Sequence, residues 1–352
     1  MSTFQPPRPE DGEVGVAVIG AGYWGPNLVR NFLNCDDTWL WSVCDLDVAR
    51  AAKVVGKRTS VRVTAELSEI LEDERIEAIA IATPAATHLP IAMAAIEAGK
   101  HILVEKPLAL STADARTIAE AADAAGLVAM CDHTFCYTPA VTRIGEEIAA
   151  GNLGRIQYVD SVRINLGLVQ PDTDVFWDLL PHDLSILDSV LPAESRPVSV
   201  SAVGVDPIGA GKPCVGYASI LLPDDAIAHI HVSWLSPVKI RNVVFGGSLR
   251  HLVWNDTDPT QRISTYERGV DIAHIDDDDE QRALMFQYRI GDMHAPALTD
   301  AEALQTLVRD FASCIRNGGR PRTDLWQGVR VLEILEAVDR SRSENGALVP
   351  VA

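Results

Sequence analysis

The stretch VGVAVIGAGYWGPNLVRNFL, residues 14–33, decides the fold of this chain. Its first six residues, Val14–Ile19, are apolar and rich in β-branched side chains, which predicts a buried parallel strand. Three glycines follow in GxGxxG spacing, and Pro26–Leu33 then carries apolar residues at helical period. The order of strand, glycine turn and helix predicts the start of a dinucleotide-binding domain.

Each glycine of this turn has an expected task. Gly20 permits the tight turn, Gly22 lets the backbone approach a pyrophosphate, and Gly25 lets helix and strand pack closely. The N-terminus of the following helix would face the phosphates. A plain tight turn is the alternative, but the strand before the motif favours cofactor binding.

The second predicted strand, Leu40–Cys44, ends at Asp45, 20 residues after the last of these glycines. A carboxylate at this position accepts hydrogen bonds from the adenosine ribose hydroxyls and repels a 2′-phosphate. The next residues, Leu46 and Asp47, offer no arginine to hold such a phosphate. We therefore expect NAD in preference to NADP. The alternative is that Asp45 only caps the helix predicted over 48–55.

Strand and helix continue to alternate as far as residue 131. Further strands are predicted over 76–81, 101–104 and 127–131, and helices over 89–98 and 112–125. This pattern predicts an α/β fold whose N-terminal part is a Rossmann domain, a doubly wound parallel sheet, over residues 14–134.

A lysine follows one of these strands. Glu105-Lys106-Pro107 comes directly after the strand over 101–104, and ligands of such sheets bind at the carboxyl ends of the strands. Lys106 therefore stands where a reacting group is expected, and its ammonium could stabilise a developing alkoxide. An ordinary surface lysine is the alternative.

Composition and charge narrow the class of protein. The chain has 352 residues, 47% of them apolar, with 49 acidic and 30 basic side chains and a formal net charge of −19. Its length predicts two domains. The acidic balance disfavours a nucleic acid or an anionic membrane as partner, because both need clustered cations.

The six cysteines are scattered and form no CxxC pair, so we expect buried free thiols and a cytoplasmic protein. Residues 1–13 are polar and proline-rich and are expected to form a disordered leader. From this composition we expect neither a signal peptide nor a membrane span.

The second half, residues 135–352, reads differently. Predicted strands over 156–165, 198–205, 215–222, 226–233 and 239–245 follow one another, and several alternate apolar with polar residues. This predicts a C-terminal α/β domain with an open, mostly antiparallel sheet. Because an uncovered apolar sheet face is a liability, we expect a homodimer or homotetramer that pairs through this sheet. The acidic run at 276–280 is expected to be a solvated loop tip.

The segment WDLLPHDLSILDSVL, residues 177–191, carries Asp178 and His182 four positions apart. They could be a catalytic pair, two metal ligands or part of a capped helix start. A metal site lacks a third ligand at a familiar spacing, so we predict no metal. Since Pro181 is best tolerated in a first helical turn, we expect the helix to begin near it. A helix N-terminus close to His182 would then keep this base neutral.

These motifs together resemble the glucose–fructose oxidoreductase/inositol dehydrogenase (Gfo/Idh/MocA) family. The resemblance rests on GAGYWG, ATPAATH, HILVEKPLAL and WDLLPHDLSIL, and on the closing segment FASCIRNGGRPRTDLWQGVRVLEILEAVDRS. It runs from residue 14 to about residue 345. It implies a Rossmann domain joined to a domain with an open sheet, and oxidation or reduction of a secondary alcohol on a sugar, cyclitol or sugar nucleotide.

The resemblance also implies roles for residues. Lys106 and His182 would stabilise the alkoxide and take the hydroxyl proton, with Asp178 as the partner of His182 or of the substrate. The expected cofactor-binding residues are Gly20, Gly22, Tyr23, Trp24, Gly25, Asp45, Thr83, Pro84, His88, Glu105 and Lys106. The expected substrate-binding residues are Lys106, His133, Tyr137, Arg163, Asn165, Trp177, Asp178 and His182.

The substrate is the least determined part of the interpretation. Some inositol dehydrogenase-like members carry a carboxylate three residues after the histidine, where this chain has Ser185. GYWGPNLVRNF, HTFCYTPAV and WDLLPHDLSIL look more like the sugar-nucleotide dehydrogenases that oxidise the sugar C3′. Cyclitol or free-sugar oxidation is the alternative. A regulatory protein that holds NAD without turnover is a third possibility, against which Lys106, Asp178 and His182 argue.

Overall fold

The computed structural model describes residues 12–171, 173–274 and 284–351. The chain divides into two compact units. Met1–Thr138 and Ala301–Glu336 form the first unit, and Pro139–Asp300 and Ala337–Ala352 form the second. Each unit is described by itself below.

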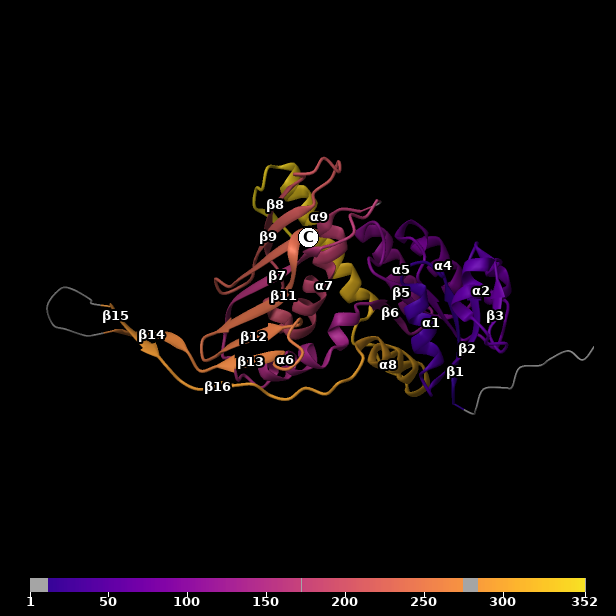
Figure 1. Ribbon diagram of the computed structural model, residues 1–352, viewed down its shortest axis with the longest axis horizontal. Helices are drawn as coiled ribbons and strands as arrows, with labels where there is room; N and C mark the ends of the chain where they lie inside the picture. The colour runs from indigo at the N-terminus through magenta and orange to yellow at the C-terminus, as the bar shows by residue number, and fades with distance from the viewer. Residues whose placement is uncertain (1–11, 172, 275–283, 352) are drawn as a thin grey trace, which may run out of the picture. The chain divides into compact units, whose positions relative to one another are not determined.

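The first unit contains a parallel sheet of six strands in the order β3-β2-β1-β4-β5-β6 (Figure 1). The strands are β1 (Val14–Ile19), β2 (Thr38–Cys44), β3 (Arg62–Thr64), β4 (Ala78–Ile81), β5 (His101–Glu105) and β6 (Ala129–Asp132). All five neighbouring pairs are parallel. The strand order reverses at β1, which places the carboxyl ends of β1 and β4 at the topological switch point of a doubly wound sheet. The predicted Rossmann domain is confirmed.

Helices connect these strands as the alternation in the sequence predicts. They are α1 (Gly25–Leu33), α2 (Val48–Val55), α3 (Leu67–Leu71), α4 (His88–Glu97) and α5 (Thr112–Ala124), with 3₁₀ turns η1 (Ala85–Thr87) and η2 (Thr134–Tyr137). Ser111 caps α5 by accepting a hydrogen bond from the backbone N–H of Asp114. The sequence interpretation missed β3 and α3, which are only three and five residues long.

A segment from the C-terminal third completes the first unit. The boundaries expected from the sequence assign residues 301–336 to the second domain, whereas α8 (Ala303–Asn317) lies against α1 and β1 (Figure 1). Phe311 is fully buried in the same apolar cluster as Val14 and Leu28. Burial of this apolar surface of α8 explains why residues 301–336 belong to the first unit.

Two charged contacts reinforce this packing at the surface of the first unit. Arg30 of α1 forms an ion pair with Glu302 at 2.6 Å. Arg316 of α8 pairs with Glu77 at 2.8 Å and donates to the carbonyl oxygens of Gly12 and Glu13. These last two residues were expected in the leader. The other leader residues, 1–11, lie outside the described part of the chain.

The second unit contains a sheet of nine strands in the order β16-β13-β12-β11-β7-β10-β9-β8-β17. Its strands are β7 (Ile156–Leu166), β8 (Ser199–Val205), β9 (Val215–Leu221), β10 (Ile227–Ser233), β11 (Leu235–Gly247), β12 (His251–Asn255), β13 (Ile263–Tyr266), β16 (Met293–His294) and β17 (Val349–Pro350). Only the central pair, β7 and β10, is parallel. The predicted open, mostly antiparallel sheet is confirmed.

The remaining elements of this unit are α6, α7, η3 and a separate two-stranded sheet. Their bounds are α6 (Pro139–Ala149), α7 (Val175–Val190), η3 (Ala193–Ser195), β14 (Gly269–His274) and β15 (Leu284–Arg289). The last helix, α9 (Leu325–Ser343), contributes residues to both units, because the division falls after Glu336. The acidic run at 276–280 lies outside the described residues.

Helix α7 begins six residues earlier than predicted, so the expected start near Pro181 is wrong. Asp174 is the N-cap, and its carboxylate accepts from the backbone N–H groups of Phe176 and Trp177 at 2.9 and 3.1 Å. Phe176 packs so closely against β9 that a β-carbon on Gly216 would lie 2.2 Å from its ring. This cap and this packing outweigh the hydrogen bond that Pro181 cannot donate inside the helix.

Among the described residues, no helix is long and apolar enough to cross a membrane. All six cysteines lie in the described part of the chain, and they are buried and form no disulfide.

We predict that Phe311→Ala lowers the free energy of unfolding by about 3–5 kcal/mol, because it empties a fully buried site in the core of the first unit. Leu46→Ala, at a side chain that is 93% exposed, is the control and should change it by less than about 0.5 kcal/mol. Denaturant titration measures both. Equal effects of the two substitutions would contradict the assignment of α8 to this core.

Candidate functional site

The glycine turn between β1 and α1 has the geometry that its three expected tasks require. Gly20 has a φ of +98°, and a β-carbon there would lie 2.6 Å from the carbonyl oxygen of Ala82. A β-carbon on Gly25 would lie 2.1 Å from the carbonyl oxygen of Gly20. At Gly22, by contrast, a β-carbon would meet nothing within 4 Å, which leaves open space for an approaching group. Tyr23, also expected at the cofactor, is 91% exposed.

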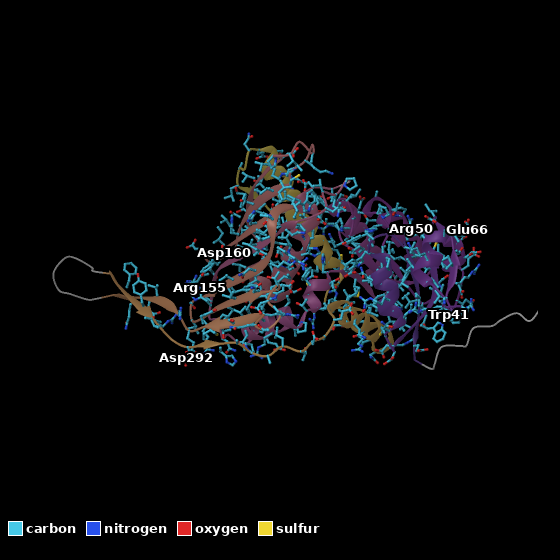
Figure 2. The ribbon with its side chains drawn as sticks, viewed as in Figure 1. Trp41, Arg50, Glu66, Arg155, Asp160 and Asp292 are labelled. Atoms are coloured by element: carbon cyan, nitrogen blue, oxygen red, sulfur yellow. The ribbon has the colours of Figure 1, made fainter. Side chains whose placement is uncertain are left out.

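Asp45 lies at the end of β2 beside this turn and is nearly fully buried. Its carboxylate accepts hydrogen bonds from the backbone N–H groups of Ala21 at 2.6 Å and Asp47 at 2.8 Å. Arg50, which Figure 2 labels, lies on α2 and adds a 2.6 Å ion pair. Burial acts to raise the pKa of Asp45, but the hydrogen bonds from Arg50, Ala21 and Asp47 outweigh it and the pKa is lowered. Asp45 is therefore ionised, as a ribose acceptor must be.

The end of β4 is held to the end of β5 by His88, at the first position of α4. Its Nε2 lies 2.9 Å from the carbonyl oxygen of Thr83, and its Nδ1 lies 3.0 Å from that of Pro107. The ring is buried, and burial lowers its pKa. Pro84 precedes the 3₁₀ turn η1, where the hydroxyl of Thr87 donates to the carbonyl oxygen of Pro84 at 2.8 Å. His88 thus positions the two loops that carry Thr83 and Lys106.

Lys106 directly follows β5 and is partly buried. Glu105, the last residue of β5, is the register partner of Asp132, the last residue of β6. The indole Nε1 of Trp24 donates to Oδ2 of Asp132 at 2.7 Å. Trp24 and Glu105, two residues expected at the cofactor, therefore lie beside Asp132, which the sequence interpretation left out, and Lys106 directly follows Glu105.

His133 and Tyr137 lie just beyond β6 and are both buried. The hydroxyl of Tyr137 donates to Oδ2 of Asp310 at 2.7 Å and lies 3.3 Å from the hydroxyl of Thr323. Burial, and then the negative charge of Asp310, raise the pKa of Tyr137 well above its usual value. The structure thus uses the Tyr137 hydroxyl inside the first unit, where the sequence interpretation expects it to face substrate.

In the second unit, Asp178 and His182 both lie on α7, one turn apart. Residues at positions i and i+4 share a helical face, so the two side chains are neighbours along one face of α7. The indole Nε1 of Trp234 donates to Oδ2 of Asp178 at 2.9 Å and fixes that carboxylate. His182 is the eighth residue of α7, beyond the reach of the N-terminal dipole, so the expected neutralising effect of the helix start is wrong.

The other expected substrate residues of this unit have defined partners. Trp177 donates from Nε1 to Asp339 at 2.8 Å. Arg163 is buried and forms an ion pair with Asp183 of α7, with Nε to Oδ2 at 2.7 Å and Nη2 to Oδ1 at 3.1 Å. These two nitrogens therefore already hold a carboxylate of the protein. Asn165, two residues further along β7, is partly buried.

Four residues that shape these sites were missed from the sequence. They are Arg50, Asp132, Asp183 and Trp234. Asp132 ends a strand, and the rule that selects Lys106 could have found it. The other three contact partners that no local motif marks. Arg50 lies 5 residues from Asp45, Asp183 lies 20 residues from Arg163, and Trp234 lies 56 residues from Asp178.

The residues of the first unit fit a dinucleotide. The open space at Gly22, the ionised Asp45 and the N-terminus of α1 would hold its pyrophosphate and adenosine ribose. Within the described part of the chain, no group of three or more metal-ligating side chains is present. The fold and these residues define a two-unit protein with a dinucleotide-binding Rossmann domain, the architecture of a nicotinamide-dependent oxidoreductase.

Comparison with known proteins agrees with this class. Residues 14–133 match the model of an oxidoreductase family with an NAD-binding Rossmann fold, GFO_IDH_MocA. A 4-carboxy-2-hydroxymuconate-6-semialdehyde dehydrogenase of Sphingobium sp. is 34% identical over 41% of this chain and 46% of its own length. The UDP-N-acetylglucosamine 3-dehydrogenase of Acidithiobacillus ferrooxidans is 30% identical over 61% of this chain and 66% of its own. The chain thus spans about half to two thirds of these curated relatives.

A solved structure is similar over nearly the whole chain. GenD2 from gentamicin A biosynthesis, in complex with NAD, is 26% identical, covers 99% of this chain and 100% of its own, and has a TM-score of 0.79. Residues 14–133 of this chain are thus similar to the NAD-binding domain of the GFO_IDH_MocA oxidoreductase family, and the whole chain is similar in fold to GenD2.

We predict opposite effects of alanine at two glycines of the turn. Gly22→Ala should leave the free energy of unfolding within about 0.5 kcal/mol, since it meets open space, but weaken NAD binding where the backbone must approach the pyrophosphate. Gly25→Ala should lower the free energy of unfolding by about 1–3 kcal/mol, because its β-carbon meets backbone.

Denaturant titration and NAD titration by fluorescence measure the two effects separately. Unchanged NAD affinity in Gly22→Ala would show that the cofactor does not approach this turn.

Proposed function

We propose that the protein is an NAD-dependent dehydrogenase that oxidises or reduces a secondary alcohol of a sugar nucleotide at the sugar C3′. The observation that carries the proposal is the position of Lys106. It follows the end of β5 in the same unit as a glycine turn with open space at Gly22 and an ionised Asp45. Bound nicotinamide would accept the hydride of the carbinol carbon.

The chain's own residues would handle the charge and the proton. In the oxidising direction, the Lys106 ammonium stabilises the developing alkoxide, and His182 takes the hydroxyl proton. Asp178, held by Trp234 and one turn before His182 on α7, orients His182 or binds a substrate hydroxyl. Lys106 belongs to the first unit and His182 to the second.

Two observations support a sugar nucleotide over a cyclitol. One relative is named for a UDP-sugar and oxidation at position 3. In this chain the position three residues after His182 is Ser185, which is fully buried and donates its hydroxyl to the carbonyl oxygen of His182 at 2.9 Å. It offers neither a carboxylate nor a free hydroxyl to an inositol.

Asp45 supports NAD in preference to NADP. Its buried, ionised carboxylate would repel a 2′-phosphate. Within the residues that the structure describes, Arg50 is the cation in contact with it, and Asp45 neutralises that charge through a 2.6 Å ion pair. The immediate sequence neighbours of Asp45 gave no sign of this arginine.

We further propose a cytoplasmic homodimer or homotetramer that pairs through the nine-stranded sheet. Val203 of β8, Tyr217 of β9 and His231 of β10 are register partners across three strands and share one face. Tyr217 stacks on His231 at 4.4 Å, and Val203 and Tyr217 are 52% and 40% exposed. Such apolar and aromatic side chains on an open sheet face favour an interface. The buried thiols of the cysteines suit a reducing compartment.

We predict that Lys106→Ala and His182→Ala lose at least about 10²-fold in kcat, while NAD still binds. The measurement is NAD reduction followed by absorbance, with a panel of UDP- and dTDP-sugars beside inositols and hexoses. Leu46→Ala, at an exposed position, is the control for effects of preparing a substituted protein. Full activity in both variants would remove these residues from the mechanism, and turnover of inositols alone would replace the sugar-nucleotide substrate.

We also predict that Asp45→Ser reverses the cofactor preference. The substitution removes the carboxylate that repels a 2′-phosphate and frees Arg50 to bind it. KM for NADP should fall and KM for NAD should rise, each by roughly tenfold, about 1.4 kcal/mol. The double variant Asp45→Ser/Arg50→Ala should lose the gain for NADP. A preference for NADP in the unaltered enzyme would contradict the role given to Asp45.

A further inference from the structure

Two carboxyl groups stand side by side at the ends of β5 and β6. Glu105 and Asp132 are register partners in this parallel pair, so their side chains point to the same side of the sheet. Asp132 is only 2% exposed. The two side chains are near enough that the negative charge of Asp132 raises the pKa of Glu105. Because two carboxylates side by side in a buried place disfavour each other's ionised form, we expect one of the two to carry a proton.

The surroundings assign that proton to Glu105. Asp132 accepts hydrogen bonds from the Trp24 indole at 2.7 Å on Oδ2 and from the Thr134 hydroxyl on Oδ1. Burial raises the pKa of Asp132, and these two bonds act to lower it. Burial and then the negative charge of Asp132 raise the pKa of Glu105 well above its usual range. Since donors to a carboxylate favour its ionised form, Asp132 is the carboxylate and Glu105 the acid.

Two charges of opposite sign act on Glu105. The negative charge of Asp132 raises its pKa, and the ammonium of Lys106 opposes part of that rise. The thiol of Cys131, on β6, has a pKa raised foremost by burial and stays neutral. His133 follows Asp132 directly and is buried. With one proton shared, the pair carries a single negative charge, which balances the ammonium of Lys106.

We propose that Glu105 and Asp132 share one proton and act as positioning residues for Lys106 and the glycine turn. The acid–carboxylate bond holds the ends of β5 and β6 together, and Asp132 holds Trp24 of the turn. Loss of the shared proton would place two negative charges against each other, separate the strand ends and disturb both Lys106 and Trp24. The part played in turnover rests on the proposed dehydrogenase function, whereas the shared proton does not.

Infrared spectroscopy of the full chain at neutral pH tests the shared proton. The unaltered protein should show the C=O stretching band of a buried, protonated carboxylic acid, and Glu105→Gln should lose it. The amide of Gln can still donate to Asp132, so this variant should fold. Glu302→Gln is the matched control in the same unit. The hydrogen bond from Arg30 lowers the pKa of Glu302, so this carboxyl group is ionised at neutral pH and Glu302→Gln should leave the band unchanged.

The same spectra can refute the proposal. A wild-type spectrum without such a band at neutral pH would overturn it. So would a band that survives in Glu105→Gln.

Cofactor binding across pH tests the positioning role without any turnover. The dissociation constant for NADH, measured by its fluorescence, should rise several-fold at alkaline pH in the unaltered protein, and this rise should be absent in Glu105→Gln. Glu105→Ala, which leaves Asp132 without its donor, should bind NADH more weakly at every pH. A pH dependence that is the same in the unaltered protein and in Glu105→Gln would overturn the role.

The free energy of unfolding, measured across pH, gives an independent check on the direction of the pKa shift of Glu105. The folded pKa of Glu105 lies above its unfolded value of about 4.3, so above that pH this one group holds more proton in the folded than in the unfolded chain. The stability that Glu105 contributes is therefore fully present at or below that value and is lost as the pH rises through the folded pKa. Glu105→Gln should flatten this part of the profile and Glu302→Gln should not. An unchanged slope in Glu105→Gln would overturn the shared proton.

Discussion

The close approach of Gly25 to Gly20 is the constraint on which the first unit depends. A β-carbon at Gly25 would lie 2.1 Å from the carbonyl oxygen of Gly20, so α1 can begin only where no side chain is present. That start fixes where Ala21 and Trp24 point. The N–H of Ala21 reaches Asp45 at the end of β2, and the Trp24 indole reaches Asp132 at the end of β6. One turn thereby links strand ends on both sides of β1, which is where a dinucleotide must lie in this fold.

Two buried carboxylates, Asp183 of the second unit and Asp132 of the first, are neutralised in different ways, and the difference separates their tasks. In the second unit, Asp183 of α7 is neutralised by Arg163 of β7 and also accepts from Ser161 at 2.9 Å. Breaking such a buried ion pair costs about 3–5 kcal/mol, since it leaves one charge unpaired. Arg163 therefore anchors α7, the helix that carries Asp178 and His182. In the first unit no arginine faces Asp132 among the contacts described, and a proton shared with Glu105 limits the pair to one negative charge.

The parts of the fold that could be predicted are those governed by local pattern. β1, α2 and the start of α5 fall where apolar periodicity and a capping serine place them, since each depends on residues within about one element. The failures depend on contacts between distant segments. The return of α8 to the first unit is decided by Phe311 and its apolar neighbours, which lie almost 300 residues after β1. The early start of α7 is decided by Asp174 and by the space at Gly216, which outweigh the local preference of Pro181.

The candidate site divides in the same way. Motifs found Lys106, Asp45 and the three glycines, because their positions follow from strand ends and turn geometry. Motifs could not show that Tyr137 donates to Asp310 or that Arg163 holds Asp183, since neither partner is near in the sequence. An ionisable or hydroxyl side chain beside a motif can belong to the site or to the packing beneath it. Its partners bear on that choice, and the Tyr137 hydroxyl and two guanidinium nitrogens of Arg163 already contact carboxylates of the protein.

Asp45 must anchor the glycine turn and must also accept hydrogen bonds from the ribose hydroxyls, and its own hydrogen bonds show how both are possible. One oxygen accepts from Ala21 and Arg50, and the other accepts from Asp47 and Arg50. A carboxylate has about four acceptor positions, so two ribose hydroxyls would need the places that Arg50 now occupies. The arginine side chain is 49% exposed, so its withdrawal into water costs little, whereas the N–H of Ala21 is fixed by the turn. The turn thus keeps its anchor while the ribose and Arg50 compete for the remaining acceptor positions, so the strength of the Arg50 contact limits how tightly the adenosine end can bind.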